Sequence, residues 1–177
     1  MFVLGIDPGV SRCGYGCVSR GDDGGPGFQA VAAGVITTPP SSPLPGRLAD
    51  LARELRALIR DLCPDAVAVE RVFFQTNART AMSVGQASGL ALAEAAEAGC
   101  AVAEYTANEV KQAVAGYGAA TKEQVQRMVA TLCDLPADPR PPDAADALAL
   151  AICHLTLAPG RARVEAALAA TARGGRP

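Results

Sequence analysis

The order of strand-like and helix-like segments restricts the possible folds of this 177-residue sequence more than any other feature. Apolar runs and alternating apolar residues predict strands, and leucines at steps of three and four over residues 44–62 predict an amphipathic helix. The predicted order is strand 1–7, strand 15–20, strand 28–38, helix 44–62, strand 65–70, helix 80–98 and strand 100–105. Short turns favour antiparallel pairing of the early strands, and helical connections favour parallel pairing of the later ones. The sequence therefore predicts an α/β fold with a mixed five-stranded sheet flanked by helices.

Three further helices are expected after the last predicted strand. Two short helices share residues 106–132 and are separated by the turn sequence "GYGAAT". A strongly apolar helix begins within "RPPDAADALALAICH", residues 140–154, and is expected to end near Leu157. We predict one domain over residues 1–158 and an Ala/Arg-rich C-terminal tail over residues 159–177 that is flexible or frayed.

The composition excludes several classes of protein. Half of the residues are hydrophobic and 19% are charged, which is typical of a globular core. No apolar run reaches the roughly 18 residues of a membrane span, and the N-terminus lacks the pattern of a signal peptide. The six scattered cysteines indicate a reducing compartment, so we expect a cytoplasmic protein without membrane association. The formal net charge of −2 gives no general attraction to nucleic acid.

The single histidine limits the chemistry that the chain can perform. His154 lies inside the apolar helix, where a packed core residue is expected more often than a catalyst. Cys13 and Cys17 have no second pair or nearby histidine to complete a zinc site. Mechanisms that need a Ser–His–Asp triad or a Cys–His pair are therefore disfavoured. Any hydrolysis is expected to depend on carboxylates and a metal ion.

Four acidic residues occupy positions from which they can meet. Asp7 ends the first predicted strand, and Glu70 ends the fourth. If these strands are adjacent and parallel, both carboxylates leave the sheet at the same edge, where open α/β sheets place their sites. Asp143 and Asp146 are three residues apart at the start of the apolar helix, so they share one face of it. A helix docked with its N-terminus at that edge would gather all four acids.

Such a group of carboxylates would repel one another and take up protons unless a cation balanced them. Oxygen ligands without cysteine or histidine suit Mg²⁺ or Mn²⁺. Two such ions, about 3.5–4 Å apart, are a common arrangement for in-line displacement at a phosphodiester. Simpler explanations remain open for each acid: Asp7 can begin a turn, and Glu70 can be an exposed strand end. Asp143 and Asp146 can cap their helix and stabilise its dipole.

Four blocks of the sequence together resemble the RuvC family of Holliday-junction resolvases. They are "GIDPGVSRCGYG", "VAVERVFFQTNARTAMSVGQASG", "NEVKQAVAGYGAATKEQVQRMV" and "PPDAADALALAICH", in that order and within residues 2–158. The resemblance implies a ribonuclease-H-like fold and a homodimer that nicks opposed strands of a four-way DNA junction symmetrically, in recombination and repair. It also implies a Mg²⁺-dependent endonuclease with two ions per site, for which Mn²⁺ can substitute. The implied partner is a branch-migration helicase complex of the RuvA and RuvB type.

The resemblance also assigns roles to residues. The metal-binding positions of the family carry Asp7, Glu70, Asp143 and Asp146. The aromatic residue that stacks on DNA bases falls on Phe73, with Phe74 beside it, and packing in the core or in a dimer is the alternative for both. The family's lysines fall on Lys111 and Lys122, which are the only lysines of this chain. Further candidates for contacts to the DNA backbone, with surface solvation as the alternative, are Arg71, Arg79 and Arg12.

Three other functions fit parts of the sequence. A ribonuclease-H-like nuclease that acts on RNA or RNA–DNA hybrids would use the same acids. An actin-like sugar kinase or chaperone ATPase would explain the resemblance of "GIDPGVS" to a phosphate loop, but those proteins need two such domains. A catalytically silent junction-binding module has no reason to gather negative charge near phosphates. We therefore predict a junction-resolving endonuclease, with the RNA-directed nuclease as the alternative.

Overall fold

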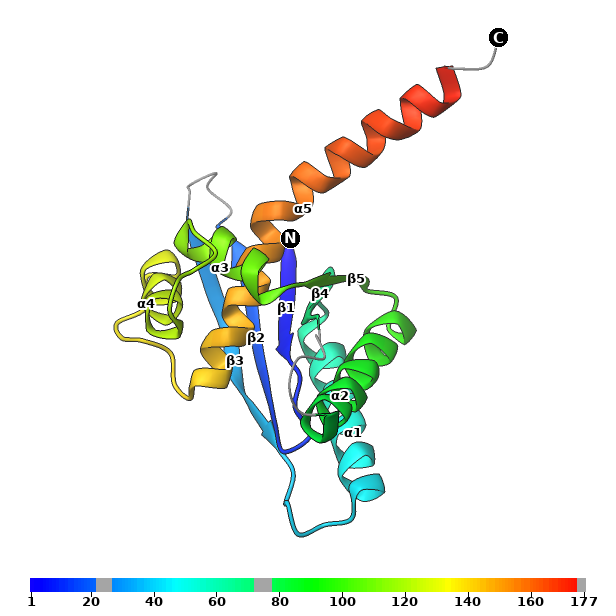
Figure 1. Cartoon of the computed structure of the whole chain (residues 1–177), viewed down its shortest axis with the longest axis vertical. Coiled ribbons are helices and arrows are strands. Elements are labelled where there is room, and N and C mark those ends of the chain that lie inside the picture. The colour runs from blue at the N-terminus through cyan, green and yellow to red at the C-terminus, as the bar shows by residue number, and fades with distance from the viewer. Residues whose placement is uncertain (22–26, 72–77, 175–177) are drawn as a thin grey trace.

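The computed structural model describes residues 1–21, 27–71 and 78–174, and these form a three-layer arrangement with helices on both faces of a central sheet (Figure 1). The elements are β1 (Phe2–Asp7), β2 (Arg12–Arg20), β3 (Phe28–Thr37), α1 (Leu44–Leu62), β4 (Ala66–Glu70), α2 (Ala78–Glu97), β5 (Ala101–Tyr105), α3 (Ala107–Ala115), α4 (Lys122–Leu132) and α5 (Pro142–Gly174). Their order and types confirm the sequence prediction.

The five strands form one mixed sheet with the order β3-β2-β1-β4-β5. β1 pairs with β2 and β2 with β3 in antiparallel orientation, whereas β1 pairs with β4 and β4 with β5 in parallel orientation. This arrangement confirms the predicted mixed sheet. β1 is the central strand and joins the antiparallel half to the parallel half. Its last residue, Asp7, therefore lies where the strands end, between the antiparallel and the parallel half of the sheet.

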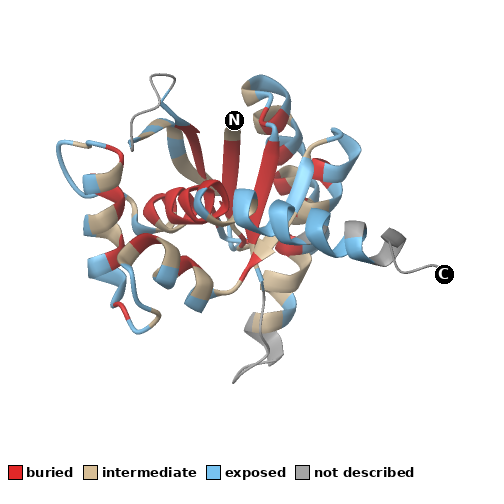
Figure 2. Ribbon diagram, turned by 90° about the horizontal axis from the view of Figure 1, so that it is seen from above, coloured by how far each residue is buried: buried red, intermediate tan, exposed pale blue. Residues whose placement is uncertain are grey.

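The two faces of the sheet are covered by different helices. Leu4 and Ile6 of β1 belong to the core cluster that contains residues of α1 and α2. Val3 of β1 and Ala68 of β4 belong to a second cluster that contains residues of α3, α4 and α5. Figure 2 shows the central strands and the first part of α5 as the most deeply buried part of the fold. No helix in the described ranges is long and apolar enough to cross a bilayer.

Alternation along the strands places both strand-end acids on the face that α5 covers. Side chains of a strand point to opposite faces in turn, so Asp7 lies on the same face as Val3 and Gly5. By the same count, Glu70 shares a face with Ala68. The parallel register pairs Ile6 with Val69, so the next residues of the two strands, Asp7 and Glu70, leave the sheet side by side. The predicted juxtaposition of these two acids is thereby confirmed.

Glycines allow α5 to lie directly on the sheet. Gly5 of β1 is paired with Gly16 of β2, and Asp7 is paired with Gly14. A Cβ atom at Gly5 would collide with the backbone oxygen of Ala147, and one at Gly14 would collide with the backbone oxygen of Asp143. A Cβ atom at Gly16 would lie 2.6 Å from the backbone nitrogen of Leu148. The helix backbone therefore rests on the strands without intervening side chains, which brings its N-terminal acids close to Asp7.

The last helix is longer than predicted. α5 continues through Pro159 to Gly174 instead of ending near Leu157, so the expectation of an early helix end is wrong. A proline inside a helix leaves a carbonyl four residues earlier without its backbone donor. Here the Arg20 guanidinium donates a hydrogen bond of 2.9 Å to that carbonyl, the oxygen of Leu155. The division at residue 158 between domain and tail stays a prediction.

The single histidine is a core residue, as predicted. His154 is 6% exposed, and its Nδ1 lies 3.0 Å from the hydroxyl oxygen of Tyr105. The Tyr105 ring is also covered by the guanidinium of Arg161, whose central carbon lies 4.5 Å from the ring centre. Arg161 in turn forms an ion pair of 2.6 Å with Glu109 at the start of α3. This network fastens α5 to β5 and α3 and leaves the histidine away from the four acids.

Candidate active site

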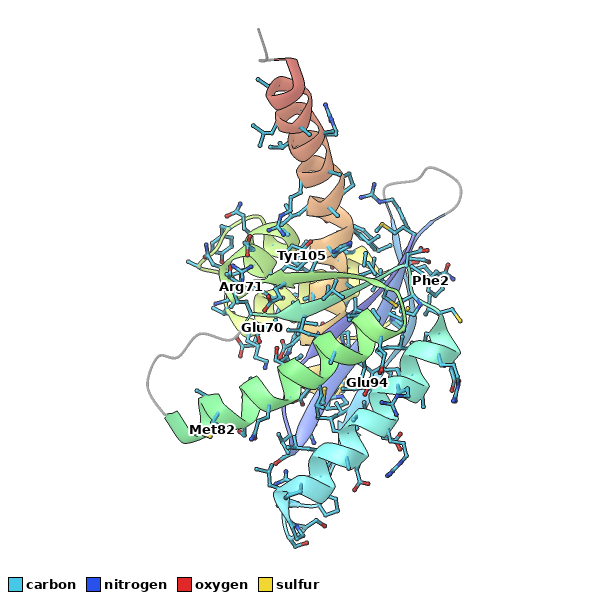
Figure 3. All side chains as sticks on the ribbon, turned by 90° about the vertical axis from the view of Figure 1, so that its right-hand side faces the viewer. Phe2, Glu70, Arg71, Met82, Glu94 and Tyr105 are labelled. Carbon is cyan, nitrogen blue, oxygen red and sulfur yellow. The ribbon has the colours of Figure 1, made fainter. Side chains whose placement is uncertain are left out.

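A pocket of about 350 Å³ lies where β1, β4, α3, α4 and α5 meet. Three of the four predicted acids, Asp7, Glu70 and Asp146, line it. The two lysines of the chain, Lys111 and Lys122, line it as well. Figure 3 shows Glu70 at the end of β4, followed by Arg71. The structure thus brings together residues from five separate elements, and the apolar part of the wall comes from α3, α4 and α5.

The strand-end acids share an environment that favours their protonated forms. Burial, followed by the nearby charges of Glu70 and the two helix aspartates, raises the pKa of Asp7 to about 7. The pKa of Glu70 is also raised, first by burial and then by Asp146. A carboxyl group beside other carboxylates resists ionisation because each negative charge repels the next. The cluster therefore has excess negative charge that a cation would relieve.

Asp143 is held by an arginine at the edge of this cluster. The Nε and Nη2 atoms of Arg12 donate hydrogen bonds of 3.2 and 2.8 Å to Oδ2 of Asp143. The Arg12 guanidinium holds the pKa of Asp143 below its usual range. Asp143 lies in the first turn of α5, where the helix dipole also favours a negative charge. Capping and membership of the acidic cluster are therefore compatible roles.

Asp146 is held by a lysine from a different helix. Nζ of Lys122 lies 2.5 Å from Oδ2 of Asp146. Lys122 is the first residue of α4, and a capping box between Thr121 and Gln124 fixes the start of that helix. The lysine therefore reaches the pocket from a helix end of defined position. Its ammonium group balances part of the negative charge of the four acids.

The four acids fit a divalent metal ion by their chemistry. Their donors are all carboxylate oxygens, which Mg²⁺ and Mn²⁺ prefer. In the described ranges, no three Asp, Glu, His or Cys side chains are gathered closely enough to enclose an ion as they stand. Two of the acids point instead to the cations of Arg12 and Lys122. Metal binding would therefore require Lys122 to release Asp146, which a flexible lysine side chain permits.

Of the remaining predicted site residues, the structure describes the surroundings of Arg71 alone. Arg71 is exposed beside Glu70, and its backbone N–H donates a hydrogen bond of 2.8 Å to the oxygen of Tyr105. Phe73 and Phe74 lie outside the described residues. Arg79 is the second residue of α2, and its side chain lies outside the described part of the chain. The DNA-contact roles of these residues stay predictions.

A larger hollow of about 830 Å³ lies near the C-terminal ends of α1 and α2, at the other end of the parallel strands. Its acids are already neutralised: Arg56 forms two hydrogen bonds of 2.8 Å with Glu94 and an ion pair of 3.9 Å with Glu97. Figure 3 shows Glu94 on α2 facing α1. Glu94 is 7% exposed, so its carboxylate needs the partner that Arg56 supplies across the contact between α1 and α2. The hollow has none of the charge imbalance of the β1–β4 edge.

Sequence reasoning missed the contact between Arg12 and Asp143. It took Arg12 as a DNA-backbone contact or a solvated residue, whereas the side chain is paired with a predicted metal ligand. The glycines at alternate positions of β2, Gly14 and Gly16, signal only that another element packs closely on this face of the strand. A strand without side chains on one face indicates a close-packed neighbour, and the cross-strand partner of Gly14 is Asp7.

The comparisons with known proteins agree with this geometry. The family model described as "Crossover junction endodeoxyribonuclease RuvC" matches residues 3–154. A RuvC of Chloroflexus aggregans is 53% identical over 159 residues, which cover 90% of this chain and 95% of the relative. A RuvC of a Parafrankia species is 49% identical over 176 residues, which cover 98% of this chain and 97% of the relative.

Solved structures show the same fold. The Thermus thermophilus RuvC structure has a TM-score of 0.82 and 39% identity, and the match covers 89% of this chain and 95% of that one. The same protein in complex with a Holliday junction substrate gives a TM-score of 0.83 with 39% identity, over 89% of this chain and 94% of that one. The yeast mitochondrial Holliday junction resolvase is 17% identical with a TM-score of 0.62, over 85% of this chain and 76% of that one, and shows the fold alone. The chain therefore belongs to the RuvC family of crossover junction endodeoxyribonucleases.

Proposed function

We propose that this protein resolves four-way DNA junctions by paired, symmetric nicking in recombination and repair, and that Asp7, Glu70, Asp143 and Asp146 form its active site. The observation that carries the proposal is the pocket in which strand-end and helix-end carboxylates meet both lysines of the chain. An electronegative pocket repels DNA phosphate unless cations balance it, so the arrangement suits metal-dependent phosphodiester chemistry. Cleavage of RNA or RNA–DNA hybrids is not favoured, because the family and its relatives are endodeoxyribonucleases.

The four acids would hold two Mg²⁺ ions, with Mn²⁺ able to substitute. When bound, such ions supply an activated water and stabilise the leaving oxygen in an in-line displacement at phosphorus. The raised pKa of Asp7, about 7, means that this carboxyl must lose its proton before it can act as a ligand near neutral pH. Asp143, whose pKa is lowered, is already ionised and would provide a fixed negative ligand.

The lysines would serve the phosphate rather than the metal. Lys122 forms an ion pair with Asp146, and a cation that replaces it there would free its ammonium for a phosphate oxygen. Lys111 lines the same pocket from α3 and would contact the neighbouring backbone. Both lysines would offset the negative charge that builds up during phosphodiester cleavage.

The other contacts follow from the family resemblance. We assign base stacking near the junction centre to Phe73, assisted by Phe74, and backbone contacts to Arg71 and Arg79. A homodimer would present two such sites to opposed strands, which accounts for paired nicking. A branch-migration complex of the RuvA and RuvB type would deliver the junction. The cytoplasmic location stays a prediction.

A comparison of labelled substrates tests this function. We expect purified protein with Mg²⁺ to nick a four-way junction at opposed strands at least about tenfold faster than duplex DNA or an RNA–DNA hybrid of the same sequence. Removal of the metal with EDTA should stop the nicking and leave junction binding measurable by gel shift. Preferential cutting of the hybrid, or equal cutting of linear duplex, would contradict the proposal.

Replacement of Phe73 by alanine tests the stacking assignment. Base–aromatic stacking contributes on the order of 1–3 kcal/mol, so Phe73→Ala should slow junction nicking about tenfold or more. The thermal unfolding temperature should stay near that of the wild type. A large drop in unfolding temperature with unchanged nicking per folded molecule would instead assign Phe73 to packing.

A further inference from the structure

Arg12 connects the antiparallel half of the sheet to the helix that carries the acids. It is the first residue of β2, and it is separated from Asp143 by 131 positions in the sequence. Both donor atoms of its contact, Nε and Nη2, bind the same carboxylate oxygen, Oδ2 of Asp143. The contact lies at the surface of the site, since the Arg12 side chain is 49% exposed and the Asp143 side chain 28%.

A second residue of β2 touches the same aspartate. Gly14 is two positions after Arg12, on the same face of the strand, and its missing side chain lets the Asp143 backbone approach. Gly14 is also the cross-strand partner of Asp7. One strand therefore sets both the distance of Asp143 from Asp7, through the glycine, and the direction of its carboxylate, through the arginine.

The arginine contact differs in kind from the lysine contact of the same site. Lys122 holds Asp146 through one ammonium on a flexible chain, so it can leave. The Arg12 guanidinium is planar and directs two N–H groups at the same oxygen, so it fixes where Oδ2 of Asp143 lies. Arg12 can therefore stay bound to Asp143 while a metal ion binds to the carboxylates on the other side of the cluster.

We propose that Arg12 is a positioning residue that holds the Asp143 carboxylate in the direction required for metal binding. This inference rests on the proposed function of the four acids and adds a residue to their support. It replaces both sequence-based alternatives for Arg12, a DNA-backbone contact and a solvated surface residue. A phosphate contact would need the guanidinium to leave Asp143, whereas a positioning role uses the contact that the structure contains.

The test compares Arg12→Gln and Arg12→Lys with wild type and with a matched control, Arg47→Gln. Arg47 lies close by, and its guanidinium donates to Ser11 and Thr38 rather than to any of the four acids. Three quantities are measured: Mn²⁺ binding to the protein alone by electron paramagnetic resonance, the Mg²⁺ dependence of single-turnover junction nicking, and junction affinity in EDTA.

Arg12→Gln should weaken Mn²⁺ binding and raise the Mg²⁺ concentration for half-maximal nicking, each about tenfold, while junction affinity in EDTA stays within about twofold. Arg12→Lys should recover part of the loss, because a lysine retains the charge but not the two-donor geometry. Arg47→Gln should leave all three quantities unchanged.

Two results overturn the inference without touching the proposed function. One is a fall in junction affinity with unchanged metal dependence, which would make Arg12 a DNA contact. The other is wild-type behaviour of Arg12→Gln in both metal measurements. If the wild-type protein fails to nick junctions with metal, the proposed function is wrong. The difference in Mn²⁺ binding between wild type and Arg12→Gln still decides the role of Arg12.

Discussion

Asp7→Asn should abolish metal-dependent nicking of four-way junctions, with a loss in single-turnover rate on the order of 10³-fold or more. Asp7 is the residue at which β1, β4 and α5 meet, and its carboxylate interacts with all three other acids. An amide has nearly the same shape but cannot balance a cation. Junction binding, measured by gel shift in EDTA, should persist, because the substitution removes a negative charge near the phosphates.

The same substitution should stabilise the metal-free protein. The pKa of Asp7 is 3.8 when the chain is unfolded and about 7 when it is folded. Between these values the folded state binds the extra proton, so its stability decreases as the pH rises through this window and then levels off above about pH 7. Asp7→Asn should therefore raise the free energy of unfolding at pH 8 by roughly 2–4 kcal/mol and flatten its pH dependence.

Urea unfolding at pH 4 and pH 8, in EDTA, checks this prediction. The difference between Asp7→Asn and wild type should be small at pH 4 and large at pH 8. A variant that is less stable than wild type at pH 8, or one with full nicking activity, would contradict the assignment of Asp7 to a strained, metal-binding cluster. Asp138→Asn is a matched control, because Asp138 is an exposed acid in the segment between α4 and α5.

Gly5→Ala should destabilise the fold by about 3 kcal/mol or more, or prevent folding. The added Cβ would collide with the backbone of Ala147, which cannot move aside as a flexible side chain could. Relief would require α5 to lift from the sheet and to carry Asp143 and Asp146 away from Asp7. Nicking activity per folded molecule should therefore fall together with stability, as measured by urea unfolding and single-turnover nicking.

Gly46→Ala is the control for this substitution. A Cβ atom at Gly46, in the first turns of α1, would meet nothing within 4 Å. The change should leave nicking unaltered and shift stability by less than about 1 kcal/mol, in the stabilising direction. If Gly5→Ala proved as harmless as Gly46→Ala, the direct contact of α5 with the sheet would not be what positions the helix acids.

Much of the site follows from local patterns in the sequence. Period-2 alternation and the parallel pairing of two apolar strands are enough to place Asp7 and Glu70 on one face at one edge. Spacing by three on a helix is enough to place Asp143 and Asp146 together. These predictions succeed because they depend on backbone geometry that is nearly the same in every sheet and helix.

Other features depend on contacts between residues far apart in the chain. Neither the pairing of Arg12 with Asp143 nor the pairing of Lys122 with Asp146 has a local signature, because each joins elements whose relative position only the packed fold defines. The continuation of α5 through Pro159 contradicts the local rule, since Arg20 of a distant strand replaces the missing donor. The raised pKa of Asp7 likewise results from assembled burial and charge.

Anomalous diffraction from crystals of the wild-type protein grown with Mn²⁺ tests the central claim most directly. We expect anomalous density at the ends of β1 and β4, in the pocket lined by Asp7, Glu70 and Asp146 and on its side toward Asp143, with Lys122 displaced from Asp146. Density elsewhere, with this pocket empty and Lys122 still bound to Asp146 in crystals of nicking-competent protein, would contradict it.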